Sequence, residues 1–452
     1  MATTIRSTRG IRYATAARFE PPEVVPYSPG DELGVAGPMC PQVPGMLEQM
    51  LGVTSNQLSE DCLFLDVFAP DDAAGLPVLV WIHGGAFLNG GGSVPWYDGT
   101  RLAERGAVVV AINYRLGALG FLGGGNWGTL DQLCALEWVQ QHIGLFGGDP
   151  GRVTIFGESA GGSSLVALMA APASAGRVHG VWAMSPSINQ LRTLEAASCW
   201  EAEFLEAAGV GSVDEARSLP LDAVLAAQTA VTSKPNVNYD MFSPAAGGTG
   251  LPADLLGAAA ANPVPFCVGT NRDENLLFLA FDPTYSSATV DQWHQHTERQ
   301  FGDRAPVART AYESARPGST PLQLIAAAQT DHAFRRPAQR LREARDEHGH
   351  STWMYWFTWA SPAFGGVLGS AHALDIPFAF DNLHAPGAAM LLGDDTNGQA
   401  LATRFADEIV AFARSAGASW PAFDRSARPT LRLDVETELV HDPEPTLRAL
   451  HA

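Results

Sequence analysis

Residues 153–161 read Val-Thr-Ile-Phe-Gly-Glu-Ser-Ala-Gly, and this stretch decides the fold. Its first four residues are β-branched or apolar, which predicts a buried strand. Residues 162–171 continue as a run that is compatible with a helix. Ser159 therefore stands at a sharp turn between a strand and a helix, with glycines at 157 and 161. Because glycine has no Cβ, these positions let the chain turn tightly around the serine.

The setting of Ser159 points to nucleophilic catalysis. Gly-x-Ser-x-Gly between a strand and a helix is the nucleophile elbow of α/β-hydrolases. The N–H groups at the start of the following helix face the serine, where negative charge develops during acyl transfer. A dehalogenase or an epoxide hydrolase would be expected to carry aspartate at this turn, so Ser159 argues against both classes.

The composition is that of a large globular enzyme. The chain has 452 residues, of which 46% are hydrophobic and 17% are charged. These values are compatible with one large α/β domain that buries a sizeable core. The net charge of −20 disfavours nucleic acid and anionic membrane surfaces as partners. No apolar run approaches the ~20 residues that a membrane span needs.

The N-terminus and the cysteines carry no targeting or metal signal. Residues 1–19 hold four arginines, no acid and no apolar core of a secretory signal. We therefore expect them to begin the folded domain, and we expect the protein to be cytoplasmic. The odd set of cysteines has no zinc-ligand spacing, so we expect neither a metal site nor a disulfide framework. The set is Cys40, Cys62, Cys134, Cys199 and Cys267. Serine acyl transfer needs no organic cofactor, and none is expected.

Short apolar runs alternate with longer helical or loop stretches. Near-continuous apolar character is typical of parallel strands that are covered on both faces. The alternation predicts a doubly wound, mostly parallel α/β sheet. The expected strands cover residues 63–68, 78–82, 108–112, 153–156, 181–184, 266–269, 353–357 and 431–433.

Two regions with helical patterns interrupt this alternation. They cover about 189–262 and 285–349, and the second contains one long helical stretch over 321–347. Each follows an expected strand, so we expect both to be insertions that form a cap over the C-terminal edge of the sheet. No linker separates an independent second domain. The sequence therefore predicts a single domain over 1–452.

A serine nucleophile needs a base, and the base needs an orienting acid. In α/β-hydrolases the acid and then the histidine follow the serine along the chain. His372 lies in a loop of small residues after the expected strand 353–357, which favours it as the base. His384 is the nearest competitor.

The turn after the expected strand 266–269 presents two adjacent acids, Asp273 and Glu274. Either one is in the right place along the chain to orient the histidine. Both are also compatible with ordinary turn carboxylates. The pattern of residues by itself does not choose between them.

A second small-residue turn, His-Gly-Gly-Ala at 83–86, follows the expected strand 78–82. It matches the His-Gly-Gly type of loop that donates hydrogen bonds to the oxyanion. Such donors must be aimed in advance at the tetrahedral oxygen. We expect His83 to shape the loop. The expected donors are the backbone N–H groups of Gly85, Ala86 and Ala160.

Further motifs occur in order over most of the chain. They are Gly-Ile-Arg-Tyr-Ala at 10–14, Arg-Phe-Glu-Pro-Pro at 18–22, Ser-Glu-Asp-Cys-Leu at 59–63 and Phe-Gly-Gly-Asp-Pro at 146–150. Together with the elbow they resemble the type-B carboxylesterase family, and in character the bacterial para-nitrobenzyl esterases of that family. The resemblance implies an α/β-hydrolase fold and a serine carboxylester hydrolase that forms an acyl-enzyme.

The resemblance also implies a role for each site residue. Ser159 matches the nucleophile, His372 matches the base, and Glu274 rather than Asp273 matches the acid. The three backbone donors named above match the family's oxyanion hole. One departure concerns Asn275, which replaces the glycine that usually follows the acid.

The resemblance extends to a cysteine pair. Cys40 and Cys62 are similar to a pair that forms a disulfide in secreted members, and in a cytoplasmic protein we expect them to stay reduced. Cholinesterases place their choline-binding tryptophan between these cysteines, and this chain has no tryptophan there. Choline esters are therefore not expected as substrates.

The identity of the substrate stays open beyond a small-molecule ester. An amidase or carbamate hydrolase would use the same triad, and the family also contains non-catalytic adhesion proteins that have lost the nucleophile. This chain keeps all three triad residue types. The oligomeric state has no sequence signal. Six aromatic residues are candidates for an apolar pocket, although each is equally suited to the core. They are Phe87, Trp96, Tyr97, Trp127, Phe278 and Phe281.

Overall fold

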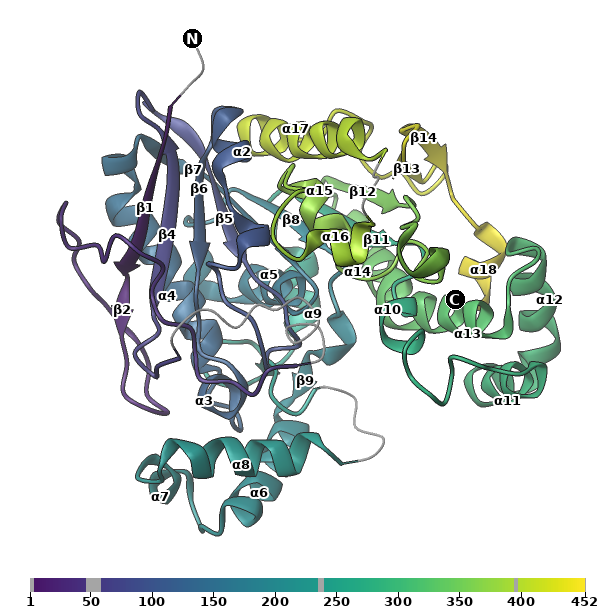
Figure 1. Ribbon diagram of the computed structural model, residues 1–452, viewed down its shortest axis with the longest axis horizontal. Helices are drawn as coiled ribbons and strands as arrows, with labels where there is room; N and C mark the ends of the chain where they lie inside the picture. The colour runs from purple at the N-terminus through teal and green to yellow at the C-terminus, as the bar shows by residue number, and fades with distance from the viewer. Residues whose placement is uncertain (1–3, 46–57, 235–239, 394–396, 452) are drawn as a thin grey trace.

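The computed structural model describes residues 4–45, 58–234, 240–393 and 397–451 (Figure 1). All eight expected strands are present and differ from the expected runs only at their ends. They are β4 (Phe64–Pro70), β5 (Leu76–Ile82), β6 (Val108–Ile112), β7 (Gly148–Glu158), β8 (Gly180–Met184), β11 (Phe266–Asn271), β12 (Thr352–Phe357) and β13 (Pro429–Leu433). The two outermost strands, β1 (Ile5–Arg12) and β14 (Glu438–His441), were not expected. Their residues are partly exposed, so their apolar signal is weak.

These strands form one sheet within the described residues, in the order β1-β4-β6-β5-β7-β8-β11-β12-β13-β14. From β6 to β13 the neighbouring strands pair in parallel. Strands β1, β4 and β14 pair antiparallel at the two sides. Two-residue ladders join β2 (Ala14–Thr15) to β3 (Glu23–Val24) and β9 (Arg192–Thr193) to β10 (Ala245–Ala246). The predicted doubly wound, mostly parallel sheet is confirmed.

Helices cover both faces of the sheet, and alternate strand residues enter two separate cores. On β5, Val80 lies in one apolar cluster and Leu79 lies in the other. The first cluster includes residues of α3 (Gly117–Phe121), α4 (Trp127–His142), α5 (Ala160–Ala170), α9 (Leu255–Ala261) and α14 (Arg336–Glu347). The second includes residues of α2 (Thr100–Glu104), α10 (Leu276–Leu279), α15 (Asp375–Ala379), α16 (Ala388–Leu392) and α17 (Gln399–Ser415).

The two regions expected as insertions are helical. The first contains α6 (Leu194–Ala208), α7 (Val213–Arg217) and α8 (Leu221–Thr232), which lie together at the bottom of Figure 1. The second contains α11 (Val290–Phe301), α12 (Ala305–Ala315) and α13 (Pro321–Thr330), at the right of the figure. The short C-terminal helix α18 (Pro445–Leu450) packs against α12.

The expected helix over 321–347 is continuous but contains a change of geometry. One π-helical turn, η6 (Asp331–Arg335), joins α13 to α14. Helix α14 packs against β11 and β12, so this end of the second region belongs to a layer of the sheet. Single π-helical turns inside longer helices often mark functional sites.

The N-terminal segment enters the sheet through β1, which pairs antiparallel with β4. Among the described residues, no helix has the length and apolar character to cross a bilayer. Cys40 and Cys62 are both buried and both are free thiols. A hydrogen bond with Cys40, together with burial, favours the protonated Cys62 thiol and raises its pKa well above the usual range.

Candidate active site

The elbow is built as its sequence requires. Strand β7 ends at Glu158 and helix α5 begins at Ala160, which leaves Ser159 between them with φ 57° and ψ −121°. Few residues other than glycine adopt a positive φ, so this backbone stores strain at the serine. A Cβ at Gly157 would lie 2.5 Å from the carbonyl oxygen of Ile82, and one at Gly161 would lie 2.0 Å from it. Both glycines are therefore needed for the turn to press against β5.

The structure brings His372 and Glu274 together. His372 Nδ1 lies 2.7 Å from Glu274 Oε2, and both side chains are buried. The other carboxylate oxygen, Oε1, accepts a hydrogen bond of 2.6 Å from the Ser185 hydroxyl and one of 2.7 Å from the Asn271 N–H. Glu274 is thereby fixed at both oxygens, and one of them faces the imidazole.

Asp273 has different partners. Its Oδ2 accepts a hydrogen bond of 3.0 Å from the backbone N–H of Ser370 and another of 3.0 Å from Arg272. Asn275, the departure noted in the sequence, has φ −73° and ψ −6°. Any L-residue adopts this conformation, so the turn after the acid does not require glycine.

The second nitrogen of His372 faces another acid, Glu158, which sequence reasoning missed. Glu158 Oε1 lies 3.1 Å from His372 Nε2, and Glu158 is 3% exposed. Among the described residues, Ser159 Oγ makes no hydrogen bond to the imidazole. Glu158 is the first of the two variable positions of the Gly-x-Ser-x-Gly motif. The sequence therefore places it beside the serine but does not show which way its side chain points.

A third buried acid completes the electrostatics of the site. Asp375 is fully buried and accepts hydrogen bonds from Asn271 Nδ2 at 3.3 Å and from the Tyr355 hydroxyl at 3.2 Å. Burial, together with the nearby charge of Glu274, raises the pKa of Asp375 to about 7. Neither Asp375 nor Ser185 belongs to a recognisable motif.

The pKa values of Glu158 and His372 are displaced by the same surroundings. Burial raises the pKa of Glu158 to about 8, with smaller contributions from its charged neighbours. Burial alone would lower the pKa of His372, but Glu158 and Glu274 outweigh it and raise that pKa to about 9. Because several acids surround one imidazole, the group titrates as a unit and not residue by residue.

The glycine-rich loop after β5 has a strained backbone and lies close to the elbow. Gly85, Ala86 and Phe87 all have positive φ values, of 104°, 54° and 60°. A Cβ at Gly84 would lie 3.1 Å from the Cβ of Ser159, which places the loop directly beside the elbow. Among the described residues, no acceptor binds the N–H groups of Gly85 and Ala86. Ala160 is the first residue of α5, where backbone N–H groups lack an intrahelical partner.

His83 supports this loop from the core. It is fully buried, its Nδ1 lies 2.8 Å from the carbonyl oxygen of Gly84, and its ring stacks on Tyr114 at 4.4 Å between centroids. Burial lowers the pKa of His83 to about 4, so its imidazole is neutral at pH 7. These contacts are those of a residue that shapes the loop.

The six aromatic candidates fall into two groups. Phe87, Trp96 and Trp127 are buried, and Tyr97 packs on Trp81 with 4.9 Å between ring centroids. Phe278 is 43% exposed, and its ring lies 5.4 Å from that of His372. Phe281 is also exposed and packs on the exposed Phe364. Phe334, which sequence reasoning missed, lies closer to His372, at 4.8 Å.

Comparison with known proteins gives a consistent result. The model of the carboxylesterase family matches residues 2–445. The para-nitrobenzyl esterase of Bacillus subtilis is 36% identical over 97% of this chain and 93% of its own length. The phenmedipham hydrolase of Pseudarthrobacter oxydans is 32% identical over 87% of this chain and 80% of its own length.

Solved structures agree with the sequence relatives. The carboxylesterase of Geobacillus stearothermophilus superposes with a TM-score of 0.85 at 33% identity, covering 99% of this chain and 96% of that chain. A para-nitrobenzyl esterase structure superposes with a TM-score of 0.82 at 34% identity, covering 99% and 95%. The match spans the sheet, the helical regions and the elbow alike. The chain belongs to the carboxylesterase family and is a serine carboxylester hydrolase with the α/β-hydrolase fold.

Proposed function

We propose that Ser159, His372 and Glu274 are the catalytic triad of this esterase. The observation that carries the proposal is the 2.7 Å contact between His372 Nδ1 and Glu274 Oε2, on loops that lie beside the strained Ser159. An acid on Nδ1 orients the imidazole and stabilises its charged form, which leaves Nε2 to exchange a proton with the nucleophile. Asp273 instead bonds Ser370 and Arg272, which supports Glu274 as the acid.

The reaction follows from these positions. Ser159 Oγ attacks the ester carbonyl carbon while its proton passes to His372 Nε2, and the carbonyl oxygen becomes an oxyanion. The proposed donors to that oxyanion are the N–H groups of Gly85, Ala86 and Ala160. The C–O bond of the ester then breaks, and the leaving alkoxide takes the proton from the imidazolium. Water attacks the acyl-enzyme by the same route and releases the acid and free Ser159.

The position of Glu158 adds one requirement to this mechanism. His372 Nε2 must turn from Glu158 Oε1 to Ser159 Oγ before it accepts the proton. Hydrogen bonds between catalytic groups are often long without substrate and tighten in the complex, so a small imidazole rotation fits this step.

Substitution of the triad tests the assignment. Ser159→Ala should lower kcat on a short-chain para-nitrophenyl ester by on the order of 10⁴-fold or more. Glu274→Gln should lose far more activity than Asp273→Asn, with circular dichroism confirming that both variants fold. Near-normal activity of Ser159→Ala would contradict the nucleophile, and a larger loss in Asp273→Asn would contradict the acid.

We further propose esters with apolar groups as the substrates. The exposed ring of Phe278 supports this, because it offers apolar surface 5.4 Å from the ring of His372. Amides and carbamates remain the second candidates, since they require the same nucleophile and donors. Matched ester, anilide and carbamate substrates with one acyl group would rank the three by kcat/KM. Highest kcat/KM for the anilide or the carbamate would contradict an ester preference.

We also propose a domain organisation and a cellular location for the protein. The single sheet that runs through the described residues supports one domain over 1–452 with insertions at 189–262 and 285–349, which predicts one cooperative unfolding transition. We propose a cytoplasmic location, in which Cys40 and Cys62 stay reduced. A thiol count on denatured protein isolated from its source would contradict this if those two cysteines were bonded.

A further inference from the structure

Asp273, the acid beside Glu274, connects the two loops that carry Glu274 and His372. Its backbone N–H donates a 2.9 Å hydrogen bond to the carbonyl oxygen of Ser370, and its Oδ2 accepts a 3.0 Å bond from the Ser370 N–H. The His372 N–H donates to the carbonyl oxygen of Glu274 at 3.2 Å. Three hydrogen bonds therefore clamp the acid turn to the histidine loop, and Asp273 contributes two of them.

Asp273 is also the first member of a chain of ion pairs that reaches the C-terminal segment. Arg316 Nη1 lies 3.9 Å from Asp273 Oδ1, and Arg316 Nη2 lies 3.1 Å from Glu444 Oε1. The other oxygen of Glu444 pairs with Arg335 Nη1. We call these four residues, Asp273, Arg316, Glu444 and Arg335, the Glu444 ion chain. Its side chains are between 6% and 14% exposed.

Arg335, at the other end of the Glu444 ion chain, lies next in sequence to a residue that contacts His372. Arg335 ends the π-helical turn η6, and the preceding residue, Phe334, packs its ring 4.8 Å from the imidazole of His372. Arg335 is held there by Glu444 and by Asp331, whose Oδ1 lies 3.5 Å from Nη1. One end of the Glu444 ion chain, Asp273, thus holds the acid turn. The other end, Arg335, holds Phe334, whose ring packs against the imidazole of His372.

Glu444 is the shared counter-charge of this chain. Its backbone has φ 56° and ψ 54°, a left-handed conformation that is strained for glutamate. Among the described residues, Nε and Nη2 of Arg335 and Nε of Arg316 have no hydrogen-bond partner. A strained residue thus holds one carboxylate between two buried guanidinium groups. Loss of a partner from a buried pair leaves an uncompensated charge, which is costly.

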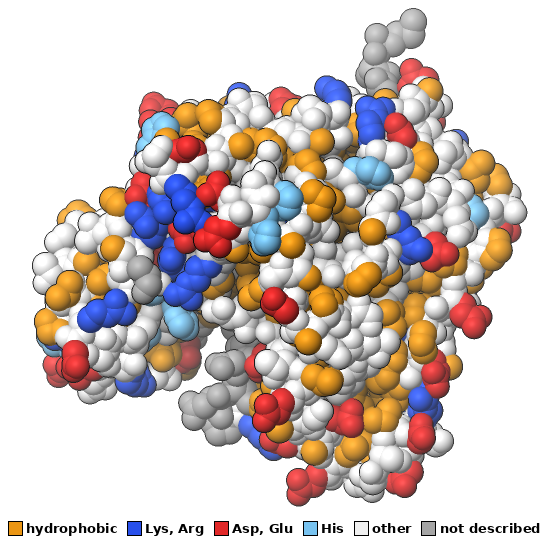
Figure 2. All heavy atoms as spheres, turned by 180° about the vertical axis from the view of Figure 1, so that it is seen from behind, with side chains coloured by type: hydrophobic (Ala, Val, Ile, Leu, Met, Phe, Trp, Pro, Cys, Tyr) orange, Lys and Arg blue, Asp and Glu red, His pale blue; other side chains and the backbone are white. Residues whose placement is uncertain are grey.

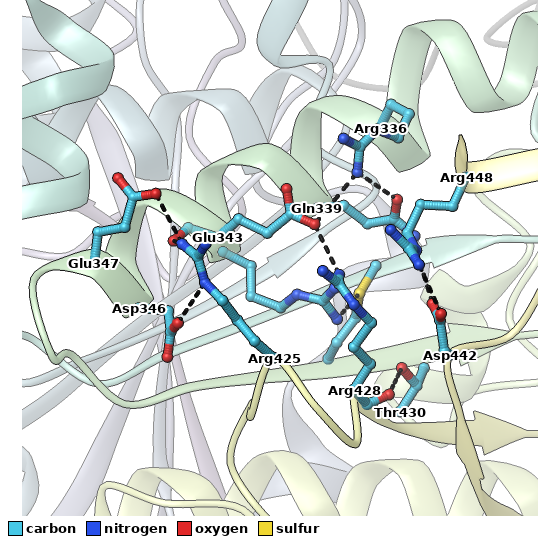
Figure 3. Close-up of polar contacts among 12 residues, drawn as sticks. Arg336, Gln339, Glu343, Asp346, Glu347, Arg425, Arg428, Thr430, Asp442 and Arg448 are labelled. Carbon is cyan, nitrogen blue, oxygen red and sulfur yellow. Dashed lines mark hydrogen bonds and ion pairs between the residues drawn. The ribbon is translucent and has the colours of Figure 1, made fainter. Parts of the chain in front are cut away.

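The Glu444 ion chain differs from the ion pairs nearby. Figure 2 shows basic and acidic side chains gathered together on one part of the back face. Figure 3 shows such a group around α14, in which Asp442 pairs with Arg448 and Glu343 pairs with Arg336 and Arg428. Asp442 is two residues from Glu444, but its side chain is 27% exposed and pairs with Arg448. The Asp442–Arg448 pair is more exposed than the Glu444 ion chain, so solvent screens it more strongly.

We propose that Glu444 and Asp273 are positioning residues, through which the C-terminal segment holds the acid turn and Phe334 against His372. This inference rests on the proposed triad. Its physical basis is that hydrolysis depends on a small distance between Glu274 and His372, and displacement of a catalytic group by about 1 Å costs on the order of 10²-fold in rate.

The test compares Glu444→Gln with Asp442→Asn in the full-length enzyme. Glu444→Gln keeps the size of the side chain and removes the charge between Arg316 and Arg335. We expect kcat for a para-nitrophenyl ester to fall about 10-fold with KM within about twofold, since substrate contacts are unchanged. The acidic limb of the kcat/KM profile should move to lower pH, because weaker contact with Glu274 lowers the pKa of His372. Asp442→Asn should leave kcat and the profile unchanged.

Two further variants keep the test decisive. Arg316→Lys keeps the positive charge, but a single ammonium group cannot reach Asp273 and Glu444 together. We expect a smaller loss of kcat than in Glu444→Gln and the same direction of pH shift. Asp273→Asn keeps an oxygen for the Ser370 N–H but loses the charge that faces Arg316. We expect it to show a similar small loss of kcat and the same direction of pH shift. If kcat and the pH profile of kcat/KM for Glu444→Gln and Arg316→Lys are the same as those for Asp442→Asn, the inference is wrong.

Failure of this inference is distinguishable from failure of the triad. If Ser159→Ala and Glu274→Gln lose activity while Glu444→Gln and Arg316→Lys keep both kcat and the pH profile, the triad stands and the positioning role falls. A purely structural role predicts a lower Tm in Glu444→Gln with unchanged kcat per folded molecule. That outcome also overturns the inference, because kcat and its pH dependence are the quantities that positioning must change.

Discussion

Glu158 and His372 are in contact across the elbow, with Glu158 Oε1 3.1 Å from His372 Nε2. The imidazole therefore lies between two glutamates, because Glu274 occupies Nδ1. A buried carboxylate near Nε2 favours the protonated imidazolium, which cannot act as a general base. The same carboxylate also stabilises the imidazolium that forms once Ser159 has given up its proton. The contact thus has opposite effects on the resting enzyme and on the reaction intermediate.

Glu158→Gln should shift the pH dependence of the enzyme. Glu158 helps to raise the pKa of His372 to about 9, so its neutralisation lowers that pKa. The neutral, reactive imidazole then persists to lower pH, and the acidic limb of kcat/KM moves toward acid. The plateau value of kcat should fall, on the order of 10-fold, because the imidazolium of the intermediate loses a favourable charge. The measurement is a pH–rate profile on a substrate whose own ionisation does not change in that range.

Glu137→Gln is a suitable control for Glu158→Gln, because Glu137 is a surface residue of α4 that pairs with Arg177. Its profile should overlay that of the wild type. An acidic limb that stays in place in Glu158→Gln would show that Glu158 does not control the protonation of His372.

Asp375→Asn should change how stability depends on pH. The folded-state pKa of Asp375 is raised from 3.8 to about 7, so the folded protein binds this proton more tightly than the unfolded chain does. The associated stability is fully present below pH 3.8 and is lost as the pH rises to about 7. Asparagine resembles the protonated acid at every pH. The Tm of Asp375→Asn relative to wild type should therefore rise between pH 4 and 7 and then level off.

Thermal unfolding of both proteins across this pH range tests the Asp375 prediction. A difference in Tm that does not vary with pH would mean that Asp375 has an ordinary pKa in the folded state. Because the comparison is between two proteins at each pH, the titration of surface carboxylates cancels.

Ser185→Ala should reduce catalysis without removing a triad residue. It deletes the 2.6 Å hydrogen bond to Glu274 Oε1, leaving the Asn271 N–H as the donor to that oxygen. Hydrogen bonds to charged groups contribute about 1.5–3 kcal/mol, so we expect a fall in kcat on the order of 10-fold. Ser174→Ala is the matched control, since Ser174 is also buried and its hydroxyl donates to the carbonyl oxygen of Ala171. Equal kcat in the two variants would contradict a role for Ser185 in holding Glu274.

Gly161→Ala should destabilise the elbow. The new Cβ would lie 2.0 Å from the carbonyl oxygen of Ile82 and 2.8 Å from that of His83, so β5 and α5 must separate. Overpacking of this kind costs about 1–3 kcal/mol, and the displaced Ser159 should also lower kcat. In Gly144→Ala the added Cβ meets nothing within 4 Å, so Tm and kcat should stay near their wild-type values. Urea unfolding of both variants measures the difference.

Much of the fold was readable from local sequence, and parts of the site were not. The buried parallel strands are continuous apolar runs, so β6 was located at its observed ends, Val108 and Ile112. The edge strands β1 and β14 escaped prediction because their burial depends on their neighbours in space. The π-helical turn η6 was read as ordinary helix, since its residues keep helical spacing.

For the site, the order of serine, acid and histidine along the chain limited the choice to a few residues. Residue pattern alone left Asp273 and Glu274 equivalent, and only the resemblance to carboxylesterases favoured Glu274. The structure separates them by direction, since Glu274 points to His372 and Asp273 points to Ser370. Adjacent residues on a turn point in different directions, and their partners lie about a hundred residues away in sequence. No local pattern encodes that choice.

By itself, the sequence determined the α/β sheet, the strained turn at Ser159 and the order of the proposed catalytic groups, because apolar runs and glycine positions act through short-range backbone geometry. The tertiary structure alone decided which acid meets His372, that Glu158 occupies its other nitrogen, and that Glu444 is linked through Arg316 to the acid turn. The physical reason is distance. Side-chain charges and hydrogen bonds act over a few ångströms in space, and only the folded chain brings residues 158, 274, 372 and 444 within that range.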